Sequence, residues 1–173
     1  MTFKRVPFCL LLVLVVLSHS FMADASQQSK ILPDKFIGSF KLDRSENFDE
    51  FLASKGVNWF VRKMVALASV TKVFKQSAAG VGVYDLDNLS LKKNTYYTGW
   101  KLSEPFRAEG FDGTIHEITF DYDSSKDLLY EKHVRVDNPE DKGETYRYAV
   151  ADGELVMTMQ NDKVTCKRYF KKQ

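Results

Sequence analysis

Residues 163–171 read Lys-Val-Thr-Cys-Lys-Arg-Tyr-Phe-Lys, and two kinds of side chain alternate along them. Successive side chains of a β-strand point to opposite faces. One face would carry Lys163, Thr165, Lys167, Tyr169 and Lys171, and its three lysines mark it as solvent-exposed. The other face would carry Val164, Cys166, Arg168 and Phe170. The stretch therefore predicts a strand whose inner face includes an arginine.

The same period of two continues through most of the chain. After Ser69, short segments rich in Val, Thr, Tyr, Phe and Ile alternate with turn clusters at 78–82, 103–105, 112–113, 123–127, 138–143, 152–153 and 161–162. This regular spacing is typical of an antiparallel meander. We expect about nine strands in this part of the chain. One more strand is expected before it, from Phe36 to Leu42.

Between that first strand and the meander, the period is helical. Phe48, Phe51 and Leu52 form one short pattern, and Gly56 is a helix terminator. The next pattern repeats at spacings of three and four, in Val57, Phe60, Val61, Met64 and Leu67. Together they predict a short helix-turn-helix.

Ten antiparallel strands without covering helices are best satisfied when the sheet curls on itself, because closure removes most exposed edges. The sequence therefore predicts an all-β fold over residues 34–173: a ten-stranded antiparallel up-and-down β-barrel with one short helix-turn-helix. The length suits a single domain with a sizeable core.

The N-terminus follows the pattern of a secretory signal peptide. Lys4 and Arg5 precede an apolar run from Phe8 to Leu17, and small residues at Ala23 and Ala25 suit a signal peptidase. The run has about half of the roughly twenty residues that a spanning helix needs, which disfavours a membrane anchor. We expect residues 1–25 to be cleaved, 26–33 to be a disordered extension, and the protein to be secreted.

Charge and cysteine content narrow the function. Without residues 1–25 the chain has 23 basic and 22 acidic residues, whereas nucleic-acid binders usually carry a basic excess. We expect no nucleic-acid partner. Cys9 lies in the signal peptide, so Cys166 is the only thiol of the mature chain. An internal disulfide is therefore excluded, and stability must come from packing.

The sequence carries no motif for catalysis, a metal or a cofactor. His116 and His133 are the only histidines after the signal peptide, and they fall in different predicted strands. They do not form a Cys/His cluster with metal spacing, and glycine-rich phosphate loops and nucleophile elbows are missing. We expect a non-enzymatic protein without a cofactor, in which both histidines are ordinary strand residues.

Arg168 allows two interpretations. A buried guanidinium needs a partner, because an unpaired internal charge is very costly. In one interpretation, it pairs with an internal Asp or Glu or curls toward the end of the barrel. In the other, it binds the carboxylate of a lipid through a two-pronged hydrogen-bonded pair.

Aromatic and methionine side chains accompany it on the neighbouring strands. Tyr146 and Tyr148 share one face, and Met157 and Met159 share another with Leu155. Such stripes are usually plain core. They could equally line a cavity, because methionine adapts to flexible apolar ligands.

Four segments resemble the fatty-acid-binding protein family, the intracellular lipid-binding proteins of the calycin superfamily. Residues 36–42 are similar to the family's opening strand, 45–57 with Arg62 and Lys63 to its helix pair, and 153–159 with 164–168 to its closing hairpin. The similarity covers residues 34–173. The chain combines these family motifs with a signal peptide and longer loops at 76–94 and 136–144. In this combination it resembles the family's secreted nematode branch.

The resemblance implies that the helix pair caps the barrel over a large, partly hydrated cavity. Ligand would enter between the second helix and two neighbouring turns, and the insertions would enlarge loops near the cavity rim. The implied function is non-catalytic binding and extracellular transport of long-chain fatty acids or similar hydrophobic ligands.

The family binds a carboxylate with an Arg-x-Tyr pair on the last strand and a second Arg on an earlier strand. Arg168 matches the first Arg, but Phe170 replaces the Tyr and lacks its hydroxyl. Tyr148 occupies the position of the second Arg, with Arg147 beside it on the opposite face. A one-residue shift or bulge would bring Arg147 inward.

We therefore expect Arg168 to bind the carboxylate, assisted by Tyr148 or Tyr146, with Arg147 as a further candidate. The expected contacts to the lipid chain or cavity wall are Phe40, Phe60, Met64, Met157, Met159 and Phe170.

Two alternative functions stay open. The chain could be an interaction module that docks to a membrane or receptor through its helix pair, motivated by Lys55, Arg62 and Lys63, to deliver lipid. It could also carry a different lipid, such as a retinoid. In either case we expect a monomer. Residues 88–90, Asn-Leu-Ser, form an N-glycosylation sequon that a strand position could block.

Overall fold

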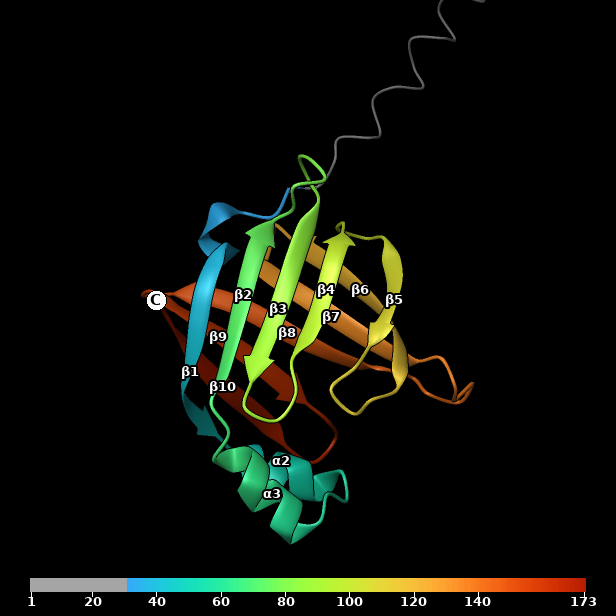
Figure 1. The fold of residues 1–173 in the computed structure, drawn as a ribbon. Coiled ribbons are helices and arrows are strands. Elements are labelled where there is room, and N and C mark those ends of the chain that lie inside the picture. The colour runs from blue at the N-terminus through green and yellow to red at the C-terminus, as the bar shows by residue number, and fades with distance from the viewer. Residues whose placement is uncertain (1–30) are drawn as a thin grey trace, which may run out of the picture.

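The computed structural model describes residues 31–173. Ten antiparallel strands form one sheet in the order β4-β3-β2-β1-β10-β9-β8-β7-β6-β5. The strands are β1 Gly38–Glu46, β2 Val70–Gln76, β3 Tyr84–Ser90, β4 Thr95–Trp100, β5 Pro105–Glu109, β6 Ile115–Asp123, β7 Leu128–Arg135, β8 Glu144–Ala151, β9 Glu154–Gln160 and β10 Thr165–Lys172. The sheet curls into a barrel (Figure 1). The predicted count, one strand before the helices and nine after them, is confirmed.

Pairing of the first and last strands brings the two ends of the described barrel together. β1 pairs with β10, with Leu42 opposite Phe170 and Ser45 opposite Arg168. The barrel is not hydrogen-bonded all the way round, since in the described residues β4 and β5 stand at opposite ends of the sheet order. They nevertheless lie next to each other in space (Figure 1).

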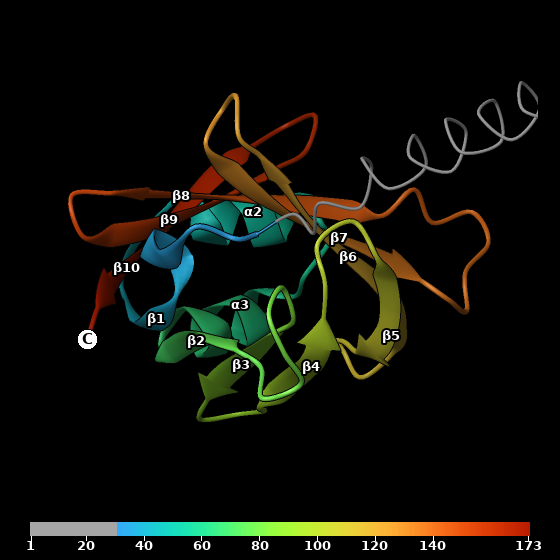
Figure 2. The same cartoon turned by 90° about the horizontal axis from the view of Figure 1, so that it is seen from above.

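Two short helices connect β1 to β2. α2 spans Phe48–Ser54, and Gly56 follows it with φ +76, in the left-handed region that glycine tolerates best. α3 spans Trp59–Ala66, and the Asn58 side chain accepts a hydrogen bond from the backbone N–H of Phe60 at 2.8 Å, which caps its first turn. The helix pair lies across one end of the barrel (Figures 1 and 2).

The predicted alternation of the last strand is confirmed. Cys166, Arg168 and Phe170 are buried, whereas Thr165 and Lys167 are exposed. The inner face continues across the barrel as a mainly aromatic and aliphatic core, in which the Trp100 ring stacks on Phe120 at a centroid distance of 4.1 Å. Burial of this apolar surface is the main source of stability in residues 31–173, where Cys166 is the only cysteine and is free.

The predicted signal peptide at 1–25 and residues 26–30 of the extension lie outside the described residues. Residues 31–33 differ from the disorder that we expect for 26–33. Leu32 is buried, and its backbone N–H donates to the Tyr84 hydroxyl at 2.9 Å. A 3-10 turn, η1 (Asp34–Phe36), then leads into β1.

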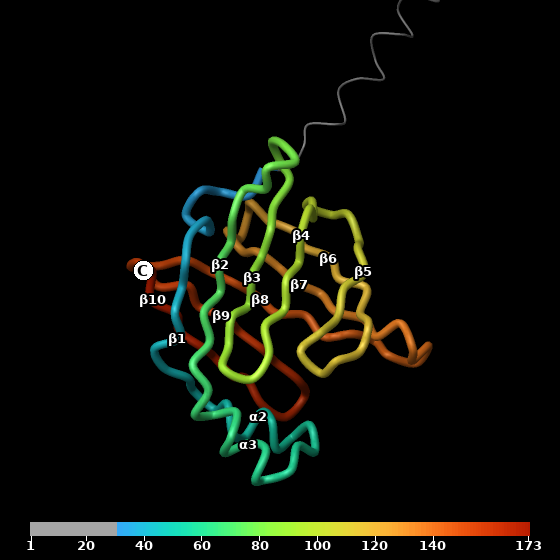
Figure 3. Tube along the Cα trace, viewed as in Figure 1, coloured from blue at the N-terminus to red at the C-terminus, as the bar shows by residue number. Residues whose placement is uncertain are grey.

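The two insertions lie in different places. The first, 76–94, includes the loop between β2 and β3 at the end of the barrel opposite the helices, and the second, 136–144, forms the loop between β7 and β8, which projects to one side (Figure 3). Only the second is near the pocket described below. Within residues 31–173, the structure contains no helix with the length and apolar content to cross a membrane.

Candidate functional site

Arg168 is the central feature of the interior. Its side chain, from β10, is only 9% exposed, and burial lowers the pKa of the guanidinium. The guanidinium carbon lies 4.3 Å from the ring centroid of Phe48 and 5.7 Å from that of Phe170, and Nε donates to the Ser45 hydroxyl at 3.4 Å. Among the described residues Arg168 forms no ion pair with a carboxylate.

This placement bears on both interpretations of Arg168. A pairing with an internal Asp or Glu is not found in residues 31–173. The contact with Phe48, the first residue of α2, shows that the guanidinium lies toward the helix end of the barrel. Its hydrogen-bonding capacity is therefore largely unused, and a carboxylate would satisfy it.

Most of the predicted contact residues share the interior with Arg168. Tyr148 lies on the same rung of the sheet, with Met157 of β9 between the two. The residues found buried are Phe40, Tyr148, Met157, Met159 and Phe170, with Tyr146 partly buried beside them. The aromatic and methionine stripes thus form a common apolar wall around the arginine.

A buried carboxylate, Glu131 of β7, forms a second polar group in the interior. It is 2% exposed; Oε1 bonds to Nε2 of His133 at 2.7 Å, and Oε2 accepts from the Tyr148 hydroxyl. Burial acts to raise the pKa of Glu131, but Lys72, His133 and Tyr148 outweigh it and hold the pKa at about 2. Glu131 is therefore an ionised group inside the barrel.

Lys72 of β2 provides the opposing charge. Its ammonium donates to Oδ1 of Asn88 at 2.6 Å, and Nδ2 of Asn88 donates in turn to the Thr95 hydroxyl at 3.1 Å. The ammonium also lies 5.4 Å from the centroid of the Tyr148 ring. Burial lowers the pKa of Lys72, opposed by the nearby Glu131.

The sequence prediction did not include Lys72, Glu131 or the interior role of His133. A signal for them was present: in β2, Lys72 stands between inward Val70 and Phe74, and in β7 the same two-residue period links Leu129, Glu131 and His133. Both histidines are also less ordinary than expected, since their rings contact each other at a centroid distance of 5.4 Å.

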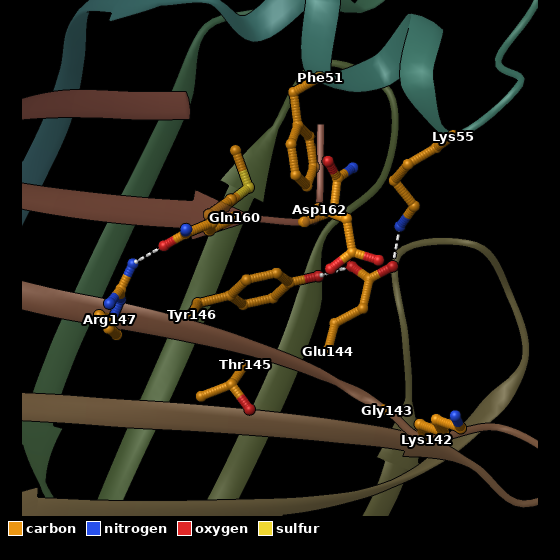
Figure 4. A pocket seen from close by; sticks show the side chains of 12 residues that line it. Phe51, Lys55, Lys142, Gly143, Glu144, Thr145, Tyr146, Arg147, Gln160 and Asp162 are labelled. Atoms are coloured by element: carbon orange, nitrogen blue, oxygen red, sulfur yellow. Dashed lines mark hydrogen bonds and ion pairs between the residues drawn. The ribbon is translucent and has the colours of Figure 1, made fainter. Parts of the chain in front are cut away.

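A pocket of about 740 Å³ lies at the helix end of the barrel, beside α2 (Figure 4). Tyr146 and Met159 of the inner wall line it, and the Lys55 ammonium forms an ion pair with Glu144 at its edge. Its volume is in the usual range of small-molecule sites. The loop between β7 and β8 contributes residues 142 and 143, so the second insertion does border this opening.

Three predicted residues do not point into the interior, although Arg147 borders the pocket from outside. Phe60 and Met64 are 64% and 60% exposed on α3, which packs mainly against α2, so their periodic pattern describes an uncovered face. Arg147 is on the outer face of β8, where it donates to Oε1 of Gln160 at 2.6 Å (Figure 4). No bulge turns it inward, because β8 keeps an unbroken register with β9 from Arg147 to Ala151.

The arrangement suits binding of an amphiphile: an apolar wall, a buried cation without an anionic partner, and an opening at the surface. Groups of three or more His, Cys, Asp or Glu side chains that could hold a metal ion are not found within the described range.

Known proteins are similar to this chain in both sequence and fold. No family model matches the chain. It is 47% identical over 161 residues to "Fatty acid-binding protein homolog 3" of Caenorhabditis elegans, covering 93% of this chain and 96% of that one. It is 51% identical over 142 residues to "Fatty acid-binding protein homolog 4" of the same organism, covering 82% and 96%. A solved structure described as "As-p18, an extracellular fatty acid binding protein" matches with a TM-score of 0.79 and 47% identity, covering 83% of this chain and 100% of that chain.

Proposed function

Since the chain belongs to the fatty-acid-binding protein family, we propose that it reversibly binds long-chain fatty acids inside its barrel and carries them without catalysis. The observation that carries the proposal is Arg168, a buried cation that lies against the Phe48 and Phe170 rings and the Ser45 hydroxyl and has no carboxylate partner within residues 31–173. A fatty-acid carboxylate would supply the missing anion, and the apolar wall would take its chain.

The structural relative described as extracellular favours transport outside the cell. The N-terminal pattern at 1–25 favours secretion independently. Expression in a secreting host, followed by N-terminal sequencing of the medium fraction, tests this part. Secreted protein beginning at Ser26 is the expected result, and retention of the full chain in cells would contradict it.

The binding proposal is tested by displacement of a fluorescent fatty acid from delipidated protein. Arg168→Leu should weaken oleate binding about 10- to 100-fold, because a hydrogen bond to a charged group contributes about 1.5–3 kcal/mol. Arg107→Leu on the exposed face of β5 is the matched control and should bind as the wild type does. Equal oleate affinity of Arg168→Leu and wild type would refute the role of Arg168.

Competition also decides the lipid class. Oleate and retinoic acid both carry a carboxylate, but differ in the shape and flexibility of the apolar part. We expect oleate to displace the probe at lower concentration, since Met157 and Met159 suit a flexible chain. The reverse order would favour a retinoid carrier.

A second candidate function, contact with a lipid surface, is favoured by one observation. α3 and the residue that follows it expose a set of large apolar side chains, Trp59, Phe60, Val61, Met64 and Leu67. The cations that motivated docking are already engaged: Arg62 and Lys63 pair with Asp49, and Lys55 pairs with Glu144. Contact would therefore rest on apolar insertion more than on charge.

Vesicle co-sedimentation at low and high salt tests this candidate. Apolar insertion should survive high salt, whereas electrostatic docking weakens as salt rises. Trp59 is exposed and Trp100 is buried, so a blue shift of the fluorescence on adding vesicles would report α3. Met64→Ser should reduce binding, with Lys132→Ser as the control. No binding at either salt concentration would eliminate the candidate.

A further inference from the structure

The Lys72 side chain crosses the interior of the barrel. β2 and β8 are separated by three strands in the sheet order, yet the Lys72 ammonium lies 5.4 Å from the ring centroid of Tyr148. The neighbouring Phe74 ring meets the same tyrosine edge-on at 6.0 Å. Lys72 is 7% exposed, so its charge is held inside the protein.

The donors of this ammonium are incompletely used. Of its three N–H groups, the Nζ–Oδ1 bond to Asn88 accounts for one. Within residues 31–173 Lys72 forms no ion pair. Glu131 is the nearby carboxylate, but His133 bonds one of its oxygens and the Tyr148 hydroxyl bonds the other. Glu131 thus offsets the charge of Lys72 without bonding to its ammonium.

The balance of buried charges points to an anionic ligand. The described buried residues include two basic side chains, Lys72 and Arg168, and one carboxylate, Glu131. Both cations flank Tyr148, one above its ring and the other on its rung of the sheet. A single ligand carboxylate between them would balance the interior and use donors that the protein leaves free.

We propose that Lys72, reaching across from the opposite wall, is the second cation that binds the ligand head group together with Arg168. The proposal rests on the proposed function and adds a binding residue to it. A carboxylate held from two walls is fixed more firmly than one held by Arg168 alone, so Lys72 should discriminate fatty acids from uncharged lipids.

Oleate and oleyl alcohol, which differ in the head group, provide the test with delipidated protein. Lys72→Met should weaken oleate binding about 10-fold or more and change oleyl alcohol binding less than about 3-fold, since hydrogen bonds to charged groups are the strong ones. Lys75→Met, on the outer face of the same strand, should bind both ligands as the wild type does.

A second variant separates binding from structural charge balance. Lys72→Met leaves Glu131 without its counter-charge and can therefore destabilise the fold. The double variant Lys72→Met/Glu131→Gln removes both charges and keeps Arg168. If Lys72 binds the head group, the double variant stays weak for oleate. If Lys72 only balances Glu131, the double variant recovers wild-type affinity, and the proposal is overturned.

The remaining outcomes are equally decisive. Equal losses for oleate and oleyl alcohol would show that Lys72 shapes the barrel and would overturn its role in recognition. Unchanged oleate affinity in Lys72→Met would do the same while leaving the proposed function intact. Wild-type protein that binds neither lipid would instead refute the proposed function, and this inference with it.

Discussion

The lipid-free protein should become more stable when Arg168 is replaced by Met. Arg168 is buried, faces Phe48 and Phe170, and has no carboxylate partner within residues 31–173. Burial lowers the pKa of its guanidinium, so the charged form is disfavoured in the folded protein. Methionine is unbranched, uncharged and flexible, so it can fill most of the space along an apolar wall.

The size of the effect follows from opposing contributions. Replacing buried charged groups by apolar ones is neutral or stabilising by about 1–4 kcal/mol. Loss of the two cation–π contacts opposes this by about 1–2 kcal/mol. The hydrogen bond to Ser45 is long, at 3.4 Å, and contributes little. A net gain of about 1 kcal/mol is expected, which raises Tm by about 2–4 °C.

Bound oleate should reverse this difference in stability between Arg168→Met and wild type. At an oleate concentration of about 100 times the wild-type Kd, binding stabilises the wild type by about 2.7 kcal/mol. With affinity reduced about 30-fold, the variant gains only about 0.9 kcal/mol. Wild type should then be the more stable protein by about 1 kcal/mol.

Urea unfolding of delipidated and oleate-loaded protein measures which of the two proteins, wild type or Arg168→Met, is more stable in each state. Arg107→Met, exposed on β5, is the control and should change the free energy of unfolding by less than about 0.5 kcal/mol in either state. A destabilised lipid-free Arg168→Met variant would refute the reasoning, because it would show that the guanidinium is already well satisfied without ligand.

Three further outcomes can be checked. Because the folded pKa of Glu131 is about 2 and its ordinary value is 4.5, its contribution to stability is fully present above about pH 4.5 and is lost as the pH falls toward 2. Urea unfolding across this pH range should show a smaller loss of unfolding free energy for Glu131→Gln than for wild type. Equal losses would contradict the lowered pKa of Glu131. Burial raises the pKa of the Cys166 thiol to about 11, so a thiol reagent at pH 8 should label native protein at least 100-fold more slowly than a Thr165→Cys/Cys166→Ser variant with an exposed thiol. Equal labelling rates for the two proteins would mean that β10 opens freely in the native protein. The Asn88 side chain, in β3, is hydrogen-bonded to Lys72 and Thr95. Protein secreted by a glycosylating host should therefore show no mass loss on enzymatic deglycosylation. A loss of glycan mass would contradict the inward orientation of the Asn88 side chain.

Periodicity predicted most of the fold because a strand with one buried face carries its orientation in its sequence. The alternation around Arg168 correctly placed it with Cys166 and Phe170 on the inner face. The helix pair was also predicted, since Gly56 carries the signal that ends one helix and the three-and-four spacing through Phe60 and Met64 marks the next.

The same reasoning failed where burial depends on a distant part of the chain. The apolar pattern of α3 predicts a covered face, but the sequence does not specify whether another element covers Phe60 and Met64. Lys72 and Glu131 were missed for a related reason. Isolated charges are usually solvated, and only the closed barrel shows that these two are buried on facing walls.

Pairing of β1 with β10 determines when the binding site can form. Ser45 and Arg168 are register partners although nearly the whole domain separates them in sequence, so their contact belongs to the slow, non-local class of folding events. A chain that emerges from its N-terminus first cannot complete this pair until its last strand is available. We therefore expect Arg168, the proposed carboxylate anchor, to take its place only when β10 pairs with β1, and truncation within β10 to remove this pairing and the proposed binding site together.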